Sequence, residues 1–435
     1  MATHIIKNQS NLNWLYLHIA MFIIGFILII TRRPDAILNP QFWAEDGTIF
    51  YAQAYNDGIL KSLFSPYAGY LHTVPRLTAA FSMFFSLKAA PLVFNVIAIT
   101  IQILPVNFLI SSRFSKLIPK LNHRIALSLL YLALPGCYEI NANLTNAQWH
   151  LALLVFMAMI AQSLQLLLNL FDVILIFVGG LTGPFAIIMI PAILFFGIYK
   201  KKNNIRINKL FYTKFWVLTA TAIIQILIIF TDKRGQERIN GLDASFLSLD
   251  SVSTIAKILI NHLFLISILG TKMTDHLVKN FPLYLYIIVG ILALIVGTTI
   301  IVYVLMRSPL ELRSFFVFAA LIPFTVLLSE FPNINDFALV GFGGRYWFNL
   351  TLAFCVGILW FYCHISNKNK SNYILQIGTL IVLLLMLLGI VSDWQHPPFT
   401  DFKFAEYADK FTELAPREKI TIPINPSWSM ELIKH

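Results

Sequence analysis

Two adjacent carboxylates, Glu45 and Asp46, lie in the densest group of polar and aromatic residues, the segment Trp43-Ala44-Glu45-Asp46-Gly47. A carboxylate in apolar surroundings is costly to desolvate unless it has a partner or a function. Because residues at i and i+1 do not share a helix face, we expect one to accept a proton and the other to be a structural ligand. The alternative is that the pair caps the start of a helix.

A second group of candidate residues follows in the same stretch of chain. His72 and Arg76 are one helical turn apart, so they could face one phosphate, although anchoring to lipid headgroups explains them equally well. The aromatic residues Trp43, Tyr67 and Tyr70 suit a wall on which a sugar stacks, and they equally suit the aromatic belt of a membrane interface. These five residues are candidates for substrate binding.

Further polar candidates occur in two later segments. They are Asn143, Gln148, Trp149, His150, Arg345 and Tyr346. Asn, Gln and His are suited to hydroxyl recognition, and an arginine can clamp a phosphate with two hydrogen bonds. The alternative for Arg345 is an arginine that extends its charge to the membrane surface within an aromatic girdle.

The composition identifies the environment of these residues. The 435 residues are 58% hydrophobic and 12% charged, and the mean hydropathy is +0.74, which is too apolar for a soluble domain. The net charge of +11 comes from short basic clusters between apolar runs, a pattern that orients membrane helices and gives no reason to expect a nucleic-acid partner. The three cysteines have no metal-ligand spacing.

The apolar runs predict an all-α polytopic membrane protein with about eleven transmembrane helices. With the basic clusters and the N-terminus in the cytoplasm, the predicted crossings are 12–30, 90–110, 125–139, 150–168, two short helices within 170–199, 215–230, 283–306, 314–330, 347–365 and 374–391. The two short helices meet at the breaker Gly179–Pro184. Residues 31–89 then form the first external loop, and Leu71–Leu87 must lie along the membrane surface as a juxtamembrane helix.

The same assignment gives two regions, a transmembrane domain of residues 1–391 and a small external tail of residues 392–435. Residues 231–282 are predicted to form a second external loop. In the tail, Thr400 or Asp401 is expected to cap a helix that carries Phe404 and Phe411, and residues 420–423 are expected to be extended.

Several motifs together resemble the bacterial integral membrane glycosyltransferases of the GT-C fold. They are Trp43–Gly47, Pro66–His72 with Pro75-Arg76, Leu181–Phe185, and Arg345-Tyr346. Within that fold the chain looks most like the serotype-converting glucosyltransferases that modify O-antigen in lipopolysaccharide.

The resemblance implies an undecaprenyl-phosphate-linked sugar as donor, a glycan acceptor, and a periplasmic site in a bacterial inner membrane. It implies that an acidic residue of the first external loop is the base, for which we favour Asp46, with Glu45 as the alternative. Arg76 and Arg345 would bind the departing phosphate, with His72 and His150 as secondary candidates. Trp149 or Trp43 would stack on a sugar. Some GT-C enzymes use a divalent metal, which the adjacent Glu45 and Asp46 could hold.

Two other functions fit a membrane protein with this sequence. A flippase or exporter of lipid-linked oligosaccharides would predict charges inside the spans and internal repeat symmetry, neither of which the sequence displays. An outer-face acyl or phosphoglycan transferase or ligase would need the same base and the same phosphate-binding arginines.

Overall fold

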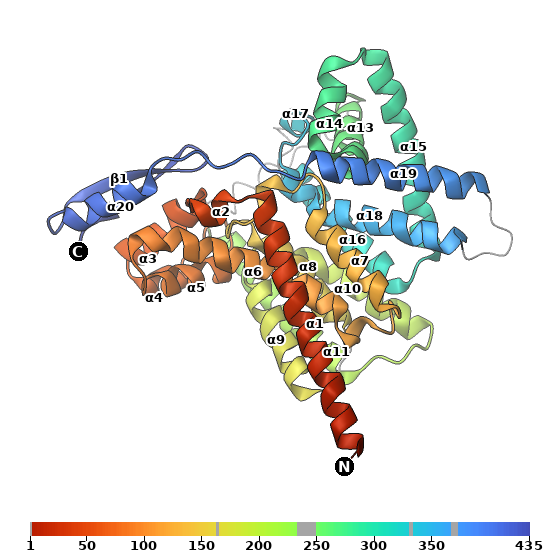
Figure 1. Ribbon diagram of the computed structural model, residues 1–435, viewed down its shortest axis with the longest axis horizontal. Helices are drawn as coiled ribbons and strands as arrows, with labels where there is room; N and C mark the ends of the chain where they lie inside the picture. The colour runs from red at the N-terminus through yellow and green to blue at the C-terminus, as the bar shows by residue number, and fades with distance from the viewer. Residues whose placement is uncertain (1, 162–164, 233–248, 330–333, 367–372) are drawn as a thin grey trace.

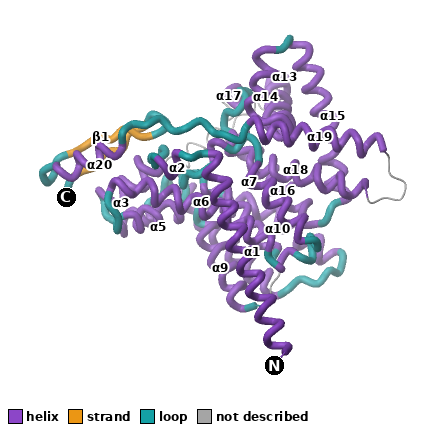
Figure 2. Tube along the Cα trace, in the orientation of Figure 1, coloured by secondary structure: helices purple, strands orange, loops and turns teal. Residues whose placement is uncertain are grey.

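The computed structural model describes residues 2–161, 165–232, 249–329, 334–366 and 373–435. Helices make up most of it, with loops between them and one hairpin near the C-terminus (Figure 2). The predicted crossings fall on α1 (Ala2–Arg32), α6 (Ala90–Ile110), α7 (Leu121–Ala133), α8 (Ala147–Ile160), α9 (Leu166–Gly180), α10 (Phe185–Lys202), α11 (Lys209–Thr231), α15 (Leu283–Arg307), α16 (Leu310–Ser329), α18 (Gly344–Ser366) and α19 (Tyr373–Ser392). The chain is an all-α polytopic membrane protein.

Eight helical stretches of the described chain are long and apolar enough to cross a membrane. Seven are predicted crossings, and the eighth, Ser251–Asn280, lies where the sequence predicted an external loop. Helices α7, α8 and α9 have 13, 14 and 15 residues, fewer than the roughly 20 needed for a full span. The expected helix over 125–139 ends early because Pro135 and Gly136, which has φ 71°, interrupt it. The predicted split of 170–199 is confirmed.

The contacts of the buried Arg32 show which helix ends lie together. Arg32, the last residue of α1, donates to the carbonyls of Leu132, Leu134 and Trp394 at 2.7, 3.0 and 3.3 Å. The ends of α1, α7 and α19 therefore share one end of the bundle, which we call the loop side. The chain N-terminus lies at the opposite end (Figure 1).

Short elements connect the long helices. On the loop side they are α2 (Asp35–Leu38), η1 (Asp46–Tyr51), α3 (Ala52–Asn56), α4 (Ile59–Phe64), α5 (Thr73–Ser82), η2 (Leu87–Ala89), η4 (Tyr138–Ile140) and α17 (Ile334–Phe337), and on the opposite side η3 (Ser112–Phe114). Helix α5 takes the place of the predicted surface helix over 71–87. It exposes Leu77 and Phe81 while it buries Arg76 and Ala79, as expected of a helix that rests on lipid.

The apolar stretch 251–280 consists of α13 (Leu249–Ile258), η6 (Leu259–Leu265) and α14 (Ile266–Asn280). Gly270 interrupts α14 with φ 77°, a backbone conformation that glycine adopts without strain. The following N–H groups of Thr271 and Lys272 donate to the Asp393 carboxylate at 2.6 and 3.1 Å. Because Asp393 follows α19 on the loop side, the kink at Gly270 also lies on the loop side.

A small α/β tail packs on the first loop. It contains α20 (Phe404–Glu413) and the antiparallel hairpin β1 (Lys419–Ile424) and β2 (Trp428–Ile433). The expected side-chain cap is wrong: Lys403 is the N-cap of α20 and has no side-chain cap bond, because the Asp401 carboxylate instead accepts from the Lys403 N–H at 2.8 Å. Residues 420–423 are extended, as predicted.

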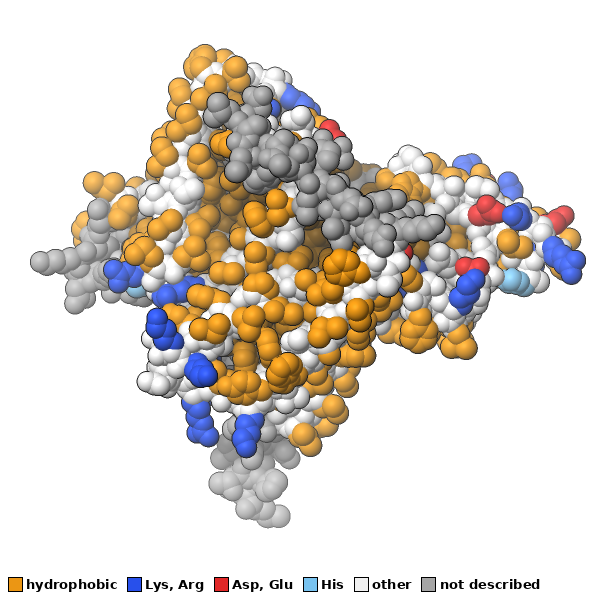
Figure 3. All heavy atoms as spheres, turned by 180° about the vertical axis from the view of Figure 1, so that it is seen from behind, with side chains coloured by type: hydrophobic (Ala, Val, Ile, Leu, Met, Phe, Trp, Pro, Cys, Tyr) orange, Lys and Arg blue, Asp and Glu red, His pale blue; other side chains and the backbone are white. Residues whose placement is uncertain are grey.

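The surface agrees with a membrane location. On the face seen in Figure 3, apolar side chains dominate the helical bundle, Lys and Arg gather at its lower edge, and the tail carries both acidic and basic side chains. Many large apolar side chains of α15 and α19, such as Leu292 and Leu387, are exposed. Such a surface is stable when lipid covers it.

Gly389→Ala is expected to destabilise the protein, because a Cβ there would lie 2.5 Å from the Ile268 carbonyl oxygen and 2.6 Å from the Leu269 carbonyl carbon. Overpacking of this kind costs about 1–3 kcal/mol. Gly378→Ala is the matched control on the same helix, since a Cβ there meets no atom within 4 Å. Thermal unfolding of the purified variants in detergent tests this expectation, and equal melting temperatures would contradict it.

Candidate functional site

Asp46 fastens the first loop to the segment that joins α7 to α8. Its side chain is 1% exposed, and its two carboxylate oxygens accept hydrogen bonds from the Leu144 N–H at 3.1 Å and from the Thr145 hydroxyl at 2.8 Å. Burial raises its pKa to about 8, against the hydrogen bond from Thr145, which lowers it. Asp46 is therefore held rigidly and has little contact with solvent.

Glu45 is only partly buried; it shares Thr145 with Asp46 and also interacts with the charges of Arg345 and Glu139. Burial raises its pKa and the nearby Glu139 raises it further, whereas the positive charge of Arg345 and a hydrogen bond from Thr145 lower it. The residue before it, Ala44, adopts φ 41°, a left-handed conformation that is uncommon for alanine. Its N–H donates to the Asn425 carbonyl at 2.5 Å, so the tail holds this turn.

Glu139 and Arg345 form an ion pair within electrostatic range of Glu45. The Arg345 guanidinium donates to the Glu139 carboxylate, and the backbone N–H of Arg345 donates to the same carboxylate at 3.1 Å. A second guanidinium nitrogen donates to the Tyr346 hydroxyl at 3.0 Å. The Arg345 side chain remains 37% exposed, so this cation is oriented by its partners and still accessible to a ligand.

Amides order the loop that carries Glu139. Asn143 and Asn146 both donate to the Glu139 carbonyl, at 2.6 and 3.0 Å. The Trp149 indole donates to the Asn146 side chain at 3.2 Å, and its ring meets the Tyr346 ring edge to face at 5.4 Å between centroids. The structure therefore brings together six predicted site residues: Glu45, Asp46, Asn143, Trp149, Arg345 and Tyr346.

The candidates of the second group lie around Phe50. The rings of Phe50, Tyr67 and Tyr70 surround His72 at centroid distances of 5.3, 5.9 and 4.8 Å. Arg76 lies over the Phe50 ring at 5.1 Å. Phe50 and Asp46 lie four residues apart on η1, so this aromatic group adjoins the carboxylate site through that one short helix.

Arg76 is buried among neutral partners. One of its guanidinium nitrogens donates to the Gln53 side chain at 2.6 Å and to the Ser62 hydroxyl at 3.0 Å. Burial lowers its pKa to about 10, although Asp57 raises it. Among the described residues its Nε and Nη2 have no hydrogen-bond partner, which leaves capacity to bind an anion.

Comparison with known proteins adds a likeness in helical arrangement. No protein-family model and no curated protein matches the sequence. Among solved structures, the chain is similar to the Archaeoglobus fulgidus oligosaccharyltransferase, in its apo form and tethered through a disulfide bond to an acceptor peptide with the NVT sequon. The TM-score is 0.45 in both cases, with 12% and 13% identity, and the match covers 92% of this chain. It spans 59% of that protein's length in the apo form and 58% in the tethered form.

The remaining sequence candidates lie outside the Glu45 cluster. The Trp43 ring stacks on Phe399 of the tail at 4.8 Å between centroids. His150 is buried, and its two ring nitrogens face the Tyr131 hydroxyl at 2.8 Å and the Ile140 carbonyl at 3.2 Å. Gln148 donates to the Thr145 carbonyl at 3.3 Å. In this structure, these contacts give Trp43 and His150 packing roles.

The side chains around Glu45 and Asp46 give little support to the predicted divalent metal site. Within the described chain, no three His, Cys, Asp or Glu side chains come together as metal ligands. Asp46 already accepts two protein hydrogen bonds and Glu139 pairs with Arg345. Among the described residues, the carboxylates therefore do not form a three-ligand cation site.

Two residues of the site, Thr145 and Glu139, are not among the candidates predicted from the sequence. Thr145 connects to both acidic residues, yet a lone threonine in a loop carries no recognisable signal. Glu139 was visible as an acidic residue at the end of a predicted span, but its pairing with Arg345, 206 positions away, depends on the fold.

The raised pKa of Asp46 predicts a pH dependence of stability. The folded protein retains a proton on Asp46 that the unfolded chain releases at its ordinary pKa of 3.8, so stability falls as the pH rises toward about 8. In Asp46→Asn this dependence is expected to disappear. Melting temperatures between pH 5 and 9 test it, and parallel curves for the two proteins would rule it out.

Proposed function

We propose that the protein is an inverting membrane glycosyltransferase that transfers a sugar, with glucose as our first choice, from an undecaprenyl-phosphate-linked donor. The acceptor is a periplasmic glycan such as O-antigen, and the loop side faces the periplasm of a bacterial inner membrane. The observation that carries this proposal is the position of Glu45, a half-buried carboxylate of raised pKa beside the oriented cation Arg345. Glycosyl transfer from a lipid phosphate needs a base and a cation in that arrangement.

In the proposed reaction, Glu45 accepts the proton of an acceptor hydroxyl while that oxygen attacks the anomeric carbon of the donor sugar. The bond between this carbon and the phosphate oxygen breaks, and the lipid phosphate leaves with both bonding electrons. Arg345 neutralises the negative charge that develops on the phosphate. A carboxylate whose pKa is raised is a stronger base toward the hydroxyl.

Asp46, the residue favoured from sequence alone, has a different environment from Glu45. With both oxygens bonded to protein donors and 1% exposure, it has little room to meet an acceptor hydroxyl. We therefore propose that Glu45 is the base and that Asp46 is a positioning residue that fixes the direction of Glu45.

The donor's lipid chain is proposed to lie along α4 and α5. These short helices expose Leu60, Phe64, Leu77 and Phe81, a surface on which a prenyl chain gains favourable burial. We propose that Tyr67, Tyr70, His72 and Arg76 act near the donor headgroup. We propose that Tyr346 contacts the sugars and that Asn143, Gln148 and Trp149 hold the loop behind it.

Glu45→Gln is expected to lower the rate of transfer by at least about 100-fold, because a general base typically contributes that much. Asp46→Asn is expected to retain more activity and to shift the pH profile. The assay uses purified full-length protein in liposomes with undecaprenyl-phosphate-linked radioactive glucose and extracted acceptor glycan. If Glu45→Gln is fully active and Asp46→Asn is inactive, the two roles are exchanged.

Arg345→Lys is expected to raise the donor KM about 10-fold with a smaller change in kcat, because lysine cannot hold Glu139, Tyr346 and a phosphate at once. The conservative change Tyr346→Phe removes one of these bonds and serves as the milder comparison. Steady-state kinetics over a range of donor concentrations distinguish the two, and an unchanged KM in Arg345→Lys would remove Arg345 from donor binding.

A cellular comparison separates transfer from export and ligation. Glycan is extracted from the natural host with and without the gene and analysed by mass spectrometry. The proposal predicts a hexose that is present only with the gene. Polymer retained inside cells that lack the gene would point instead to a flippase, and missing acyl groups or missing attachment would point to a ligase.

A further inference from the structure

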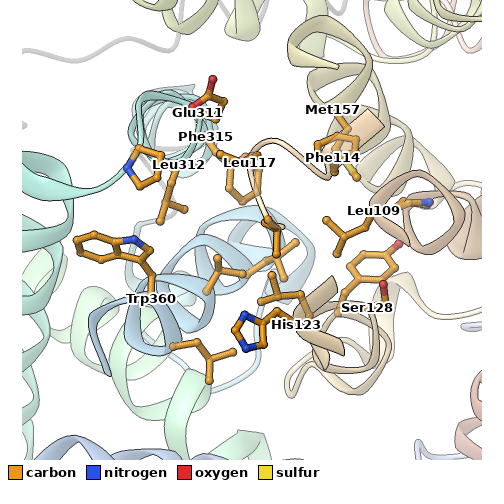
Figure 4. A pocket seen from close by; sticks show the side chains of 18 of the residues that line it. Leu109, Phe114, Leu117, His123, Ser128, Met157, Glu311, Leu312, Phe315 and Trp360 are labelled. Atoms are coloured by element: carbon orange, nitrogen blue, oxygen red, sulfur yellow. The ribbon is translucent and has the colours of Figure 1, made fainter. Parts of the chain in front are cut away.

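A cavity lies away from Glu45, in the half of the bundle opposite the loop side. Its volume is about 410 Å³, within the ~300–1,000 Å³ typical of ligand pockets. Side chains of α6, α7, α8, α16 and α18 line it, and nearly all of them are apolar. Figure 4 shows Trp360, Leu312 and Phe315 on one side of the cavity and Leu109 on the other.

A polar compartment of about 300 Å³ adjoins this cavity. The two share wall residues, including Phe114 and Leu117, and the polar part adds Arg113 and Lys116. The cavity and the compartment therefore lie side by side, one with an apolar lining and the other with a basic one.

The polar compartment carries an excess of buried positive charge. Asp172 is fully buried, and one oxygen of its carboxylate accepts from both Arg113 and Lys214, the latter at 2.5 Å. Two cations thus share one carboxylate. Beside them Lys116 is exposed and balances Glu311, the one acidic residue that lines the compartment among those described.

The hydrogen bonding of this cluster is incomplete. The Arg113 Nε is buried without a partner among the described residues, while its side chain is 5% exposed. Lys214 donates its other hydrogen bonds to the carbonyls of Ala158 and Ala161, at 2.8 and 3.3 Å. Arg113 and Lys214 share a single carboxylate charge, and unbalanced buried charge is costly, so an anion in the compartment would offset the remaining positive charge.

From the cavity and the charge together, we infer that this space binds an anionic phospholipid of the surrounding membrane. One acyl chain fills the apolar cavity, and the phosphate sits between Arg113 and Lys116. Burial of the chain and charge-assisted hydrogen bonds to the phosphate both favour the complex. The site is separate from Glu45, and it does not depend on the proposed transferase activity.

The first test is native mass spectrometry of the purified full chain with phosphatidylglycerol or phosphatidylethanolamine. We expect one phosphatidylglycerol to be retained in preference to phosphatidylethanolamine. Lys116→Glu should weaken retention about 30-fold, because reversal removes one attraction and adds one repulsion of similar size. Lys120→Glu is the matched control, since Lys120 is also exposed and lines neither space. An equal loss in both variants would reduce the effect to general surface charge and overturn the inference.

The second test fills the cavity. Leu312→Trp should abolish retention of phosphatidylglycerol, whereas Leu305→Trp, on a lipid-exposed position of α15, should not. Unchanged melting temperatures and gel-filtration profiles confirm that both variants fold. Retention that persists in Leu312→Trp, or tighter retention of undecaprenyl phosphate than of phosphatidylglycerol by the natural protein, would overturn the assignment of this space to a membrane phospholipid.

Discussion

The candidate site depends on one buried carboxylate and the two groups that donate to it. Asp46 reaches across from the first loop to Leu144 and Thr145, and a buried carboxylate is tolerated only when its oxygens are satisfied in this way. Since neighbouring residues point in different directions, fixing Asp46 also fixes Glu45. Without this bond, the loop and the Glu139–Arg345 pair would move independently, and a base and a cation would have no defined spacing.

The tail provides the other half of the support. Ala44 keeps its left-handed conformation while its N–H bonds to Asn425, and Asn56 exchanges hydrogen bonds with both Glu431 and Ile433 of β2. Glu45 is thus held between a contact with the membrane bundle and a contact with the tail. Both supports are made of hydrogen bonds, most of them to backbone groups, and these define a position more closely than apolar packing does.

Sequence patterns predicted the membrane helices well because length and apolarity decide them. The breaker at Gly179–Pro184 and the surface position of α5 also followed from charge and parity. Ser251–Asn280 was predicted to be an external loop, although its mean hydropathy of 1.9 is a signal present in the sequence. Its kink at Gly270 and its anchor at Asp393 exist only in the folded chain. The site is limited in the same way, because contacts between distant residues cannot be read from the sequence. Glu45, Asp46 and Arg345 were recognisable as residue types. The contacts of Thr145 and the different surroundings of the two acids arise only in the folded chain. The buried cluster around Asp172 was likewise invisible as a cluster.

The packing of the tail on the first loop also sets an order of assembly. Residues 41–56 follow the first helix, whereas Asn425 and β2 follow the last predicted span. During synthesis the first loop emerges early and must wait for every later helix to insert before its partner strand is made. A chain released after α19 could hold all its membrane helices and still leave Glu45 without its final orientation. The site is therefore complete only after the helices that precede the tail have been inserted.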